Sequence, residues 1–119
     1  MKVAVSVWEG RVSPVFDTAS RLLILEVPKK GESSRFEVVL DDQSRAKKCS
    51  RIQSLCVEVV ICGAISRHFQ GILKASGIHV IPWICGSASE VLDAYLDGSL
   101  SHSRYLMPGC DPKRQLYET

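Results

Sequence analysis

Residues 61–66 read Ile-Cys-Gly-Ala-Ile-Ser, and residues 84–89 read Ile-Cys-Gly-Ser-Ala-Ser. The shared pattern, Ile-Cys-Gly-x-x-Ser, therefore occurs twice. Each copy follows an apolar, β-branched run typical of a strand and precedes a segment with helical spacing of its apolar residues. This alternation predicts a βαβα unit whose parallel strands end at one edge of a sheet. Ligands of open α/β folds bind at that edge, so the two Cys-Gly turns are the first candidates for a functional site.

The rest of the chain contains further strand patterns and one more helix pattern. Three apolar runs near the N-terminus, joined by polar turns, predict an antiparallel meander. A helix follows, with Cys49 and Cys56 on its buried face and Lys48 in its solvated basic face. Ser87 and Glu90 fit a capping box at the start of the last helix. The predicted elements are strands at 2–7, 22–27 and 36–40, a helix over about 44–56, a strand at 58–61, a helix at 66–76, a strand at 78–81 and a helix at 87–98.

The order βββαβαβα limits the topology. A right-handed βαβ crossover places the fourth strand beside the fifth. The usual completion of such a sheet sets the first strand parallel to the fourth. The expected spatial order is 3-2-1-4-5 with strand 2 antiparallel, which is a five-stranded mixed sheet in a ribonuclease H-like, three-layer α/β fold.

Length and charge narrow the class of protein. The 119 residues suit one domain, which we expect over residues 1–110 with a flexible tail over 111–119. With 15 basic and 13 acidic side chains, the net charge of +2 is too balanced to indicate nucleic acid as a partner. The apolar N-terminal run is too short for a signal peptide, and no run approaches the roughly 18–20 residues of a membrane span. We therefore expect a cytoplasmic protein that does not act on a membrane.

The cysteines at the predicted edge are candidate metal ligands. Five cysteines without a Cys-x-x-Cys pair, in a reducing compartment, indicate free thiols, metal ligands or redox groups. Cys62 and Cys85 are the main candidates, and Cys110 and His68 are further ones. The alternative stays open, because cysteine is among the most buried residue types and often only packs.

Glycine and arginine at the same edge suit an anionic ligand. Gly63 and Gly86 permit tight turns and expose the backbone N–H groups at the start of each following helix. Arg67 lies in the first turn of one of these helices and favours an anion. The long connection over residues 8–20 approaches the same edge, with Ser13 and Phe16 as its anchors and as secondary candidates for ligand contact.

The sequence offers little support for catalysis. A nuclease on this fold needs clustered carboxylates to hold divalent metals, whereas residues 2–7 contain no acid. Neither a P-loop nor a Gly-x-Gly-x-x-Gly motif is present. A cysteine nucleophile paired with His68 lacks a third, orienting group. We therefore expect that the protein is not an enzyme.

Several short segments recur in an order known from one family. They are MKVAV at 1–5, SPVF at 13–16, VICGAIS at 60–66, ASGIHV at 75–80, the segment 90–98 with its Ala-Tyr-Leu centre, and MPGC at 107–110. On these segments, over about residues 1–110, the chain resembles the dinitrogenase iron–molybdenum cofactor biosynthesis proteins. The resemblance implies the ribonuclease H-like fold and the binding or carriage of iron–molybdenum cofactor, or of its precursors, without catalysis.

One leading hypothesis and two others follow. The first is a non-catalytic binding or carrier protein for a metal cluster or metallocofactor, related to nitrogen fixation. Its cargo would be the iron–molybdenum cofactor, its precursor or another iron–sulfur cluster, and cofactor-assembly proteins would be its partners. The second is a regulatory or small-anion- or protein-binding module of the same fold with no metal. A thiol-dependent enzyme comes third.

Overall fold

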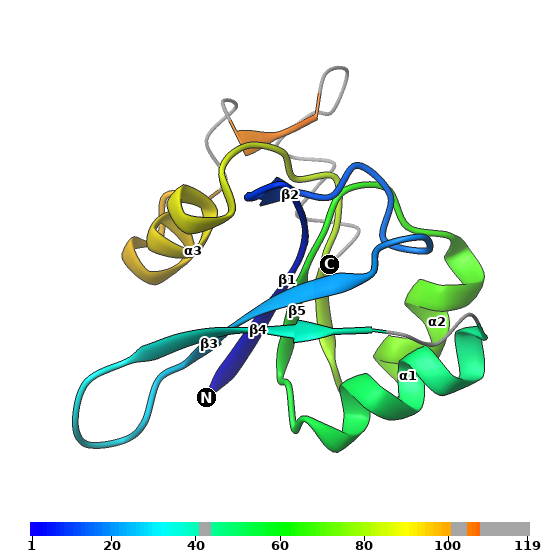
Figure 1. Cartoon of the computed structure of the whole chain (residues 1–119), viewed down its shortest axis with the longest axis horizontal. Coiled ribbons are helices and arrows are strands. Elements are labelled where there is room, and N and C mark those ends of the chain that lie inside the picture. The colour runs from blue at the N-terminus through cyan, green and yellow to red at the C-terminus, as the bar shows by residue number, and fades with distance from the viewer. Residues whose placement is uncertain (41–43, 101–104, 108–119) are drawn as a thin grey trace.

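The described residues form an α/β fold, in which a mixed sheet of six strands is accompanied by three helices (Figure 1). The computed structural model describes residues 1–40, 44–100 and 105–107. Along the sheet the order is β4-β3-β1-β5-β6, and β2 pairs with β1 off this path. The elements are β1 (Lys2–Trp8), β2 (Arg11–Val12), β3 (Arg21–Glu26), β4 (Ser34–Val39), α1 (Arg45–Ser54), β5 (Val59–Ile61), α2 (Arg67–Ala75), β6 (His79–Ile81) and α3 (Ala88–Asp97).

The directions of the strands place three carboxyl ends at one edge. β1 is parallel to β5, and β5 is parallel to β6. β3 is antiparallel to both β1 and β4. The carboxyl ends of β1, β5 and β6 therefore share one edge of the sheet, which we call the carboxyl edge.

The prediction of five strands missed β2. Trp8 pairs with Arg11 across a two-residue turn formed by Glu9 and Gly10, with φ of 52° and 76°. Positive φ at both turn residues is the type I′ geometry that suits the twist of a hairpin. A two-residue strand has no periodicity to detect, and Glu9 is an unusual residue for the left-handed region. The segment predicted as a loop thus begins as a hairpin.

The helices cover both faces of the sheet. Figure 1 shows α1 and α2 on one side and α3 on the other. Alternate residues of β1 face opposite sides of the sheet. Val3, Val5 and Val7 pack in the hydrophobic cluster on the α3 side, and Ala4 packs in the cluster on the α1–α2 side. A strand buried on both faces has an apolar run as its sequence pattern, and residues 3–5 show such a run.

Helix α1 is shorter than predicted, and the burial of Cys56 and Lys48 differs from the prediction. The helix begins after Ser44, whose hydroxyl accepts from Lys47 N, and it ends at Ser54. Cys56 lies beyond this end with φ of 58° and is exposed, so its prediction as a core thiol was wrong. Lys48, predicted as solvated, is only 6% exposed.

Helices α2 and α3 begin at serines in different ways. The Ser66 hydroxyl accepts from Phe69 N at 3.2 Å and caps α2. Ser87 is the N-cap of α3 but makes no side-chain capping bond, so the serine half of the predicted capping box is missing. Gly98 ends α3 with φ of 83°, a conformation that glycine adopts without strain.

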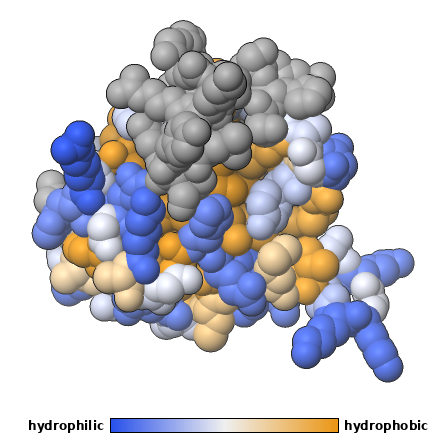
Figure 2. All heavy atoms as spheres, turned by 180° about the vertical axis from the view of Figure 1, so that it is seen from behind, coloured by the Kyte–Doolittle hydropathy of each residue, from blue (hydrophilic) through white to orange (hydrophobic). Residues whose placement is uncertain are grey.

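Figure 2 shows polar and apolar side chains interspersed on the face seen from behind. Among the described residues, none of the helices combines the length and the apolar character that spanning a bilayer requires. The predicted ligand Cys110 and the predicted tail 111–119 lie outside the described residues.

Candidate functional site

Residues 13–16 form one wall of the carboxyl edge and are tied to the turn after β5. Phe16 N donates to the Ala64 carbonyl at 2.7 Å, and Ala64 N donates to the Pro14 carbonyl at 2.8 Å. Ser13 N reaches back to the Ser6 carbonyl at 2.8 Å, and the Ser13 hydroxyl donates to the Val15 carbonyl. Backbone bonds therefore hold this loop against β1 and the β5 turn.

Phe16 anchors the loop, as the sequence predicts. Its side chain is fully buried, and its ring meets that of Phe69 edge to face, with centroids 4.9 Å apart and an interplanar angle of 87°. This is a favoured geometry for aromatic pairs. Phe16 thus fastens the loop to α2 and is directed into the core rather than toward a ligand.

Gly63 is required by the approach of this loop. A Cβ at residue 63 would lie 2.6 Å from both the Ser13 and the Pro14 carbonyl oxygens, closer than real Cβ contacts come. Gly86 is required for a different reason, since its φ of +116° is disfavoured for residues with a side chain. Its carbonyl accepts from Val12 N at 2.9 Å. Gly63 thus lets the turn after β5 lie against residues 13–14, and Gly86 lets the turn after β6 lie against Val12.

The two thiols do not occupy equivalent positions, although their motifs repeat. In the sheet Ile61 pairs with Ile81, so the residue after each strand is Cys62 in one case and Pro82 in the other. Cys85 lies three residues further along, beyond Trp83, which has φ of 67°. The repeated motif is therefore out of step with the strand register.

Cys62 is a core thiol. Its side chain is 0% exposed and packs in the cluster on the α1–α2 side of the sheet. Burial, and secondarily the nearby Asp17 carboxylate, raises the pKa of Cys62 to about 12. The metal-binding form of cysteine is the thiolate, which this environment disfavours.

Cys85 has a different environment. It is partly exposed, and its Sγ–H donates to the Leu106 carbonyl at 3.4 Å. Its backbone N donates to the Tyr105 carbonyl at 2.8 Å. Cys85 therefore faces the segment 105–107, whereas Cys62 faces helices α1 and α2.

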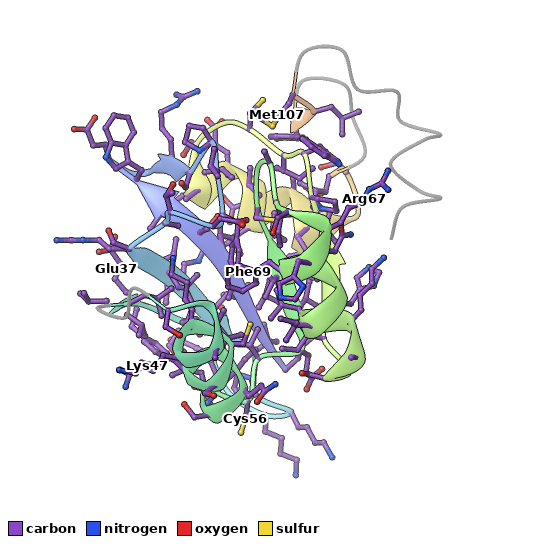
Figure 3. All side chains as sticks on the ribbon, turned by 90° about the vertical axis from the view of Figure 1, so that its right-hand side faces the viewer. Glu37, Lys47, Cys56, Arg67, Phe69 and Met107 are labelled. Carbon is purple, nitrogen blue, oxygen red and sulfur yellow. The ribbon has the colours of Figure 1, made fainter. Side chains whose placement is uncertain are left out.

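Arg67 and His68 stand at the start of α2, and both are exposed. Figure 3 shows Arg67 directed outward from this end of the helix and Phe69 directed inward. Met107 lies at the same end of the molecule in this view. The guanidinium is available to an anionic ligand at the carboxyl edge.

Asp17 and Lys48 contribute polar contacts near the start of α2 that no sequence pattern predicted. The Asp17 carboxylate accepts from Ser66 N at 3.0 Å, at the positive end of α2. The Lys48 amine donates to the Asp17 carbonyl at 2.7 Å, and burial lowers the pKa of Lys48. Asp17 stands 49 residues before the helix start that it caps, and Lys48 bends inward from a basic helix, so neither has a local pattern that could have revealed it.

A cavity of about 350 Å³ opens beside the first hairpin. Trp8, 61% exposed, and Val15, 41% exposed, belong to its lining. The predicted residue Ser13 is also among them. The remaining lining residues are Val7, Pro14, Thr18, Ala19 and Ser20.

The donors for a metal ion are sparse in the described part of the chain. Within residues 1–40, 44–100 and 105–107, no three His, Cys, Asp or Glu side chains are grouped so that they could hold one ion. One buried hydroxyl at this end of β1, Ser6 Oγ, has no hydrogen-bond partner there. The described part of the edge thus offers single donors and cations rather than a preformed cage.

Comparison with known proteins identifies a family and a fold. The family model described as dinitrogenase iron-molybdenum cofactor matches residues 1–98. Among solved structures, PH0822 superposes with a TM-score of 0.77 at 19% identity, covering 95% of this chain and 98% of that one. The apo form of the orange protein from Desulfovibrio gigas gives 0.68 at 18% identity, covering 82% and 88%.

A third structure, mj0327 from Methanocaldococcus jannaschii, gives a TM-score of 0.65 at 19% identity and covers 83% of this chain and 90% of that one. At these identities the likeness is one of fold. Among curated proteins, none matches this chain.

Proposed function

Since the chain belongs to the dinitrogenase iron-molybdenum cofactor family, we propose that it is a non-catalytic binding or carrier protein for a metal cluster or metallocofactor. The match of the family model over residues 1–98 carries this proposal. The proposed cargo is the iron–molybdenum cofactor, its precursor or another iron–sulfur cluster, and cofactor-assembly proteins are the proposed partners. The proposed place of binding is the carboxyl edge.

A preassembled cluster suits the described residues better than a single metal ion. A lone structural ion such as zinc takes about four protein ligands. The described residues offer no group of even three such side chains. A preassembled cofactor that carries its own terminal anionic ligands needs fewer protein ligands than a bare ion, so a single thiolate with cationic neighbours suits it better.

We assign the thiol contact to Cys85 in preference to Cys62. Cys85 is partly exposed and its sulfur makes a weak S–H hydrogen bond, whereas Cys62 would have to lose a proton inside the core. Arg67 would supply positive charge from the start of α2. Arg11, exposed and paired through its backbone with Ser87, would supply it from the hairpin. Cys110 and His68 stay predictions as further ligands.

The other predicted site residues would act by shaping the edge. Gly63 and Gly86 let the loop and the hairpin approach the two turns, while Ser13 and Phe16 hold the loop in place. The strand order, with β3 antiparallel to its neighbours, supports assignment of the fold to the ribonuclease H-like group.

Anaerobic reconstitution with iron and sulfide, and separately with isolated iron–molybdenum cofactor, tests the proposal. Wild type should retain iron after gel filtration, and Cys85→Ser should retain several-fold less. Cys56→Ser is the matched control, because Cys56 is an exposed thiol at the other end of the molecule, after α1. Equal retention by wild type and Cys85→Ser would remove Cys85 from the site, and no retention by wild type would remove the metal function.

In that last case the second function, a small-anion- or protein-binding module without metal, gains support. The cavity beside Trp8 is the observation in its favour, since exposed aromatic and aliphatic side chains line it. A Trp8→Ala variant that loses binding of a captured ligand, without any change in iron content, would distinguish this function from the first.

A further inference from the structure

Strand β4 is an open edge of the sheet. Within the described residues it pairs only with β3. Five of its six residues are exposed. The β3–β4 hairpin extends beyond the body of the molecule in Figure 1, and its polar tip projects in Figure 2. Such an edge presents unpaired N–H and C=O groups that can bond to another strand.

The hydrogen-bond alternation identifies the groups that face outward. Leu40 N donates to the Ser20 carbonyl at 2.7 Å, and the register places these two residues opposite each other. They therefore form a hydrogen-bonded pair, and pairs of this kind recur at every second residue of an antiparallel ladder. Arg35, Glu37 and Val39 consequently direct their N–H and C=O groups away from β3, to the free edge.

The charges of the outward-facing residues of β4 are complementary to those of β4 in a second copy of the chain. In an antiparallel pair of two copies centred on Phe36, Arg35 of each copy lies opposite Glu37 of the other. A two-fold centred on Arg35 or on Glu37 would set like charges opposite each other, which is unfavourable. Only the register centred on Phe36 forms two pairs of opposite charge. The same register lets the outward N–H and C=O groups of Arg35 and Glu37 form hydrogen bonds with the second copy.

The side chains on the two faces agree with this register. Phe36, 41% exposed, would lie opposite the Phe36 of the second copy in a non-hydrogen-bonded pair. The Cα atoms of such a pair are closer together than those of a hydrogen-bonded pair, so the two rings can pack against each other. On the other face, Arg35 already contacts Asp93, and Glu37 already contacts Arg21. Figure 3 shows Glu37 at the outer margin, where a second strand can reach it. Pairing would join these contacts into a ladder of alternating charge.

We propose that β4 is the interface of a homodimer, with its two-fold axis at Phe36 and a sheet continuous through both copies. The interface is isologous, because the same strand serves both copies. Since β4 runs parallel to β1, the two copies of β1 point in opposite directions. The two carboxyl edges therefore lie at opposite ends of the dimer and act separately.

The test uses the mass of the full chain in solution, measured by light scattering and sedimentation over a range of concentrations. Wild type should have about twice the chain mass of 13.2 kDa. Arg35→Glu and Glu37→Arg should each weaken dimerisation about tenfold or more, since each sets like charges opposite each other. Glu58→Arg, an exposed change on the β5 side of the sheet, should leave the dimer intact.

Mixing the two variants makes the test specific for the register. The Arg35→Glu copy presents two acidic side chains at positions 35 and 37, and the Glu37→Arg copy presents two basic ones, so every cross-strand pair between them is again of opposite charge. The mixture should form a heterodimer at concentrations at which each variant alone is monomeric, which also shows that both variants are folded. A monomeric wild type, dimers unaffected by either reversal, or a mixture that stays monomeric would each overturn the proposal.

Discussion

Replacing Gly63 by alanine should destabilise the protein by about 2–4 kcal/mol, because the new methyl group collides with backbone and not with a movable side chain. The Cβ would lie 2.6 Å from the Ser13 and Pro14 carbonyl oxygens. Overpacking of this kind costs about 1–3 kcal/mol, and a loop that moves away strains the two bonds to Ala64, each worth about 0.5–1.5 kcal/mol. Phe16, fully buried beneath the loop, limits that movement.

The same substitution at Gly71 is the matched control and has the opposite sign. Gly71 lies inside α2, and a Cβ there meets nothing within 4 Å. Alanine in a helix interior is favoured over glycine by about 0.8–1 kcal/mol. Gly71→Ala should therefore stabilise the protein, so the two variants separate the effect of collision from that of losing a glycine.

Urea denaturation followed by circular dichroism measures both effects. With a slope of about 1.5 kcal/mol per molar urea, a cost of about 3 kcal/mol lowers the midpoint by about 2 M. Gly71→Ala should raise the midpoint by about 0.5 M. A Gly63→Ala midpoint within about 0.5 M of wild type would refute the close approach of the loop to the β5 turn.

Three further predictions concern Cys62 and Asp17. Cys62 should resist alkylation in the folded protein at pH 8 while Cys56 reacts, as mass spectrometry of the labelled peptides would reveal, and rapid labelling of Cys62 would contradict its burial. The pKa of Cys62 rises from 9.0 to about 12 on folding, so the thiol of the unfolded chain loses its proton at a lower pH than that of the folded protein. The contribution of Cys62 to the free energy of unfolding is therefore constant below about pH 9 and falls by at most about 1.4 kcal/mol per pH unit up to pH 12. A Cys62→Ala variant should lack this part of the decline in urea titrations. Asp17→Ala should cost about 1–2 kcal/mol, because Ser66 N at the start of α2 loses its acceptor, whereas Asp17→Asn, which keeps an acceptor oxygen, should cost less; equal costs in urea denaturation would show that the bond does not matter.

Local patterns accounted for most of the secondary structure. The apolar runs before the two Cys-Gly turns became β5 and β6, and Ser44 and Ser66 cap helices because a serine oxygen satisfies a free N–H at a helix start. Strand β2 was not predicted, because two residues are too few to show a periodic pattern. The exposure of Cys56 was not predicted either, because the helical spacing of apolar residues continues past the point where α1 ends. Patterns of this kind describe neighbours along the chain, not contacts across it.

The candidate site depended more on contacts between distant segments. By itself the sequence determined that Gly63 and Gly86 stand at turns and that residues 13–16 form an anchored loop near them. Only the tertiary structure decided why Gly63 must be glycine, since the atoms that approach it belong to Ser13 and Pro14.

The same distinction applies to the repeated Cys-Gly motif. Two copies of Ile-Cys-Gly-x-x-Ser are identical in pattern, and the sequence determined that both follow strands. The strand register, which long-range pairing sets, places Cys62 directly after β5 and Cys85 three residues beyond the matching position after β6. One thiol is therefore buried against α1 and α2 while the other faces residues 105–107, because the direction of a side chain depends on the pairing of strands that no local pattern specifies.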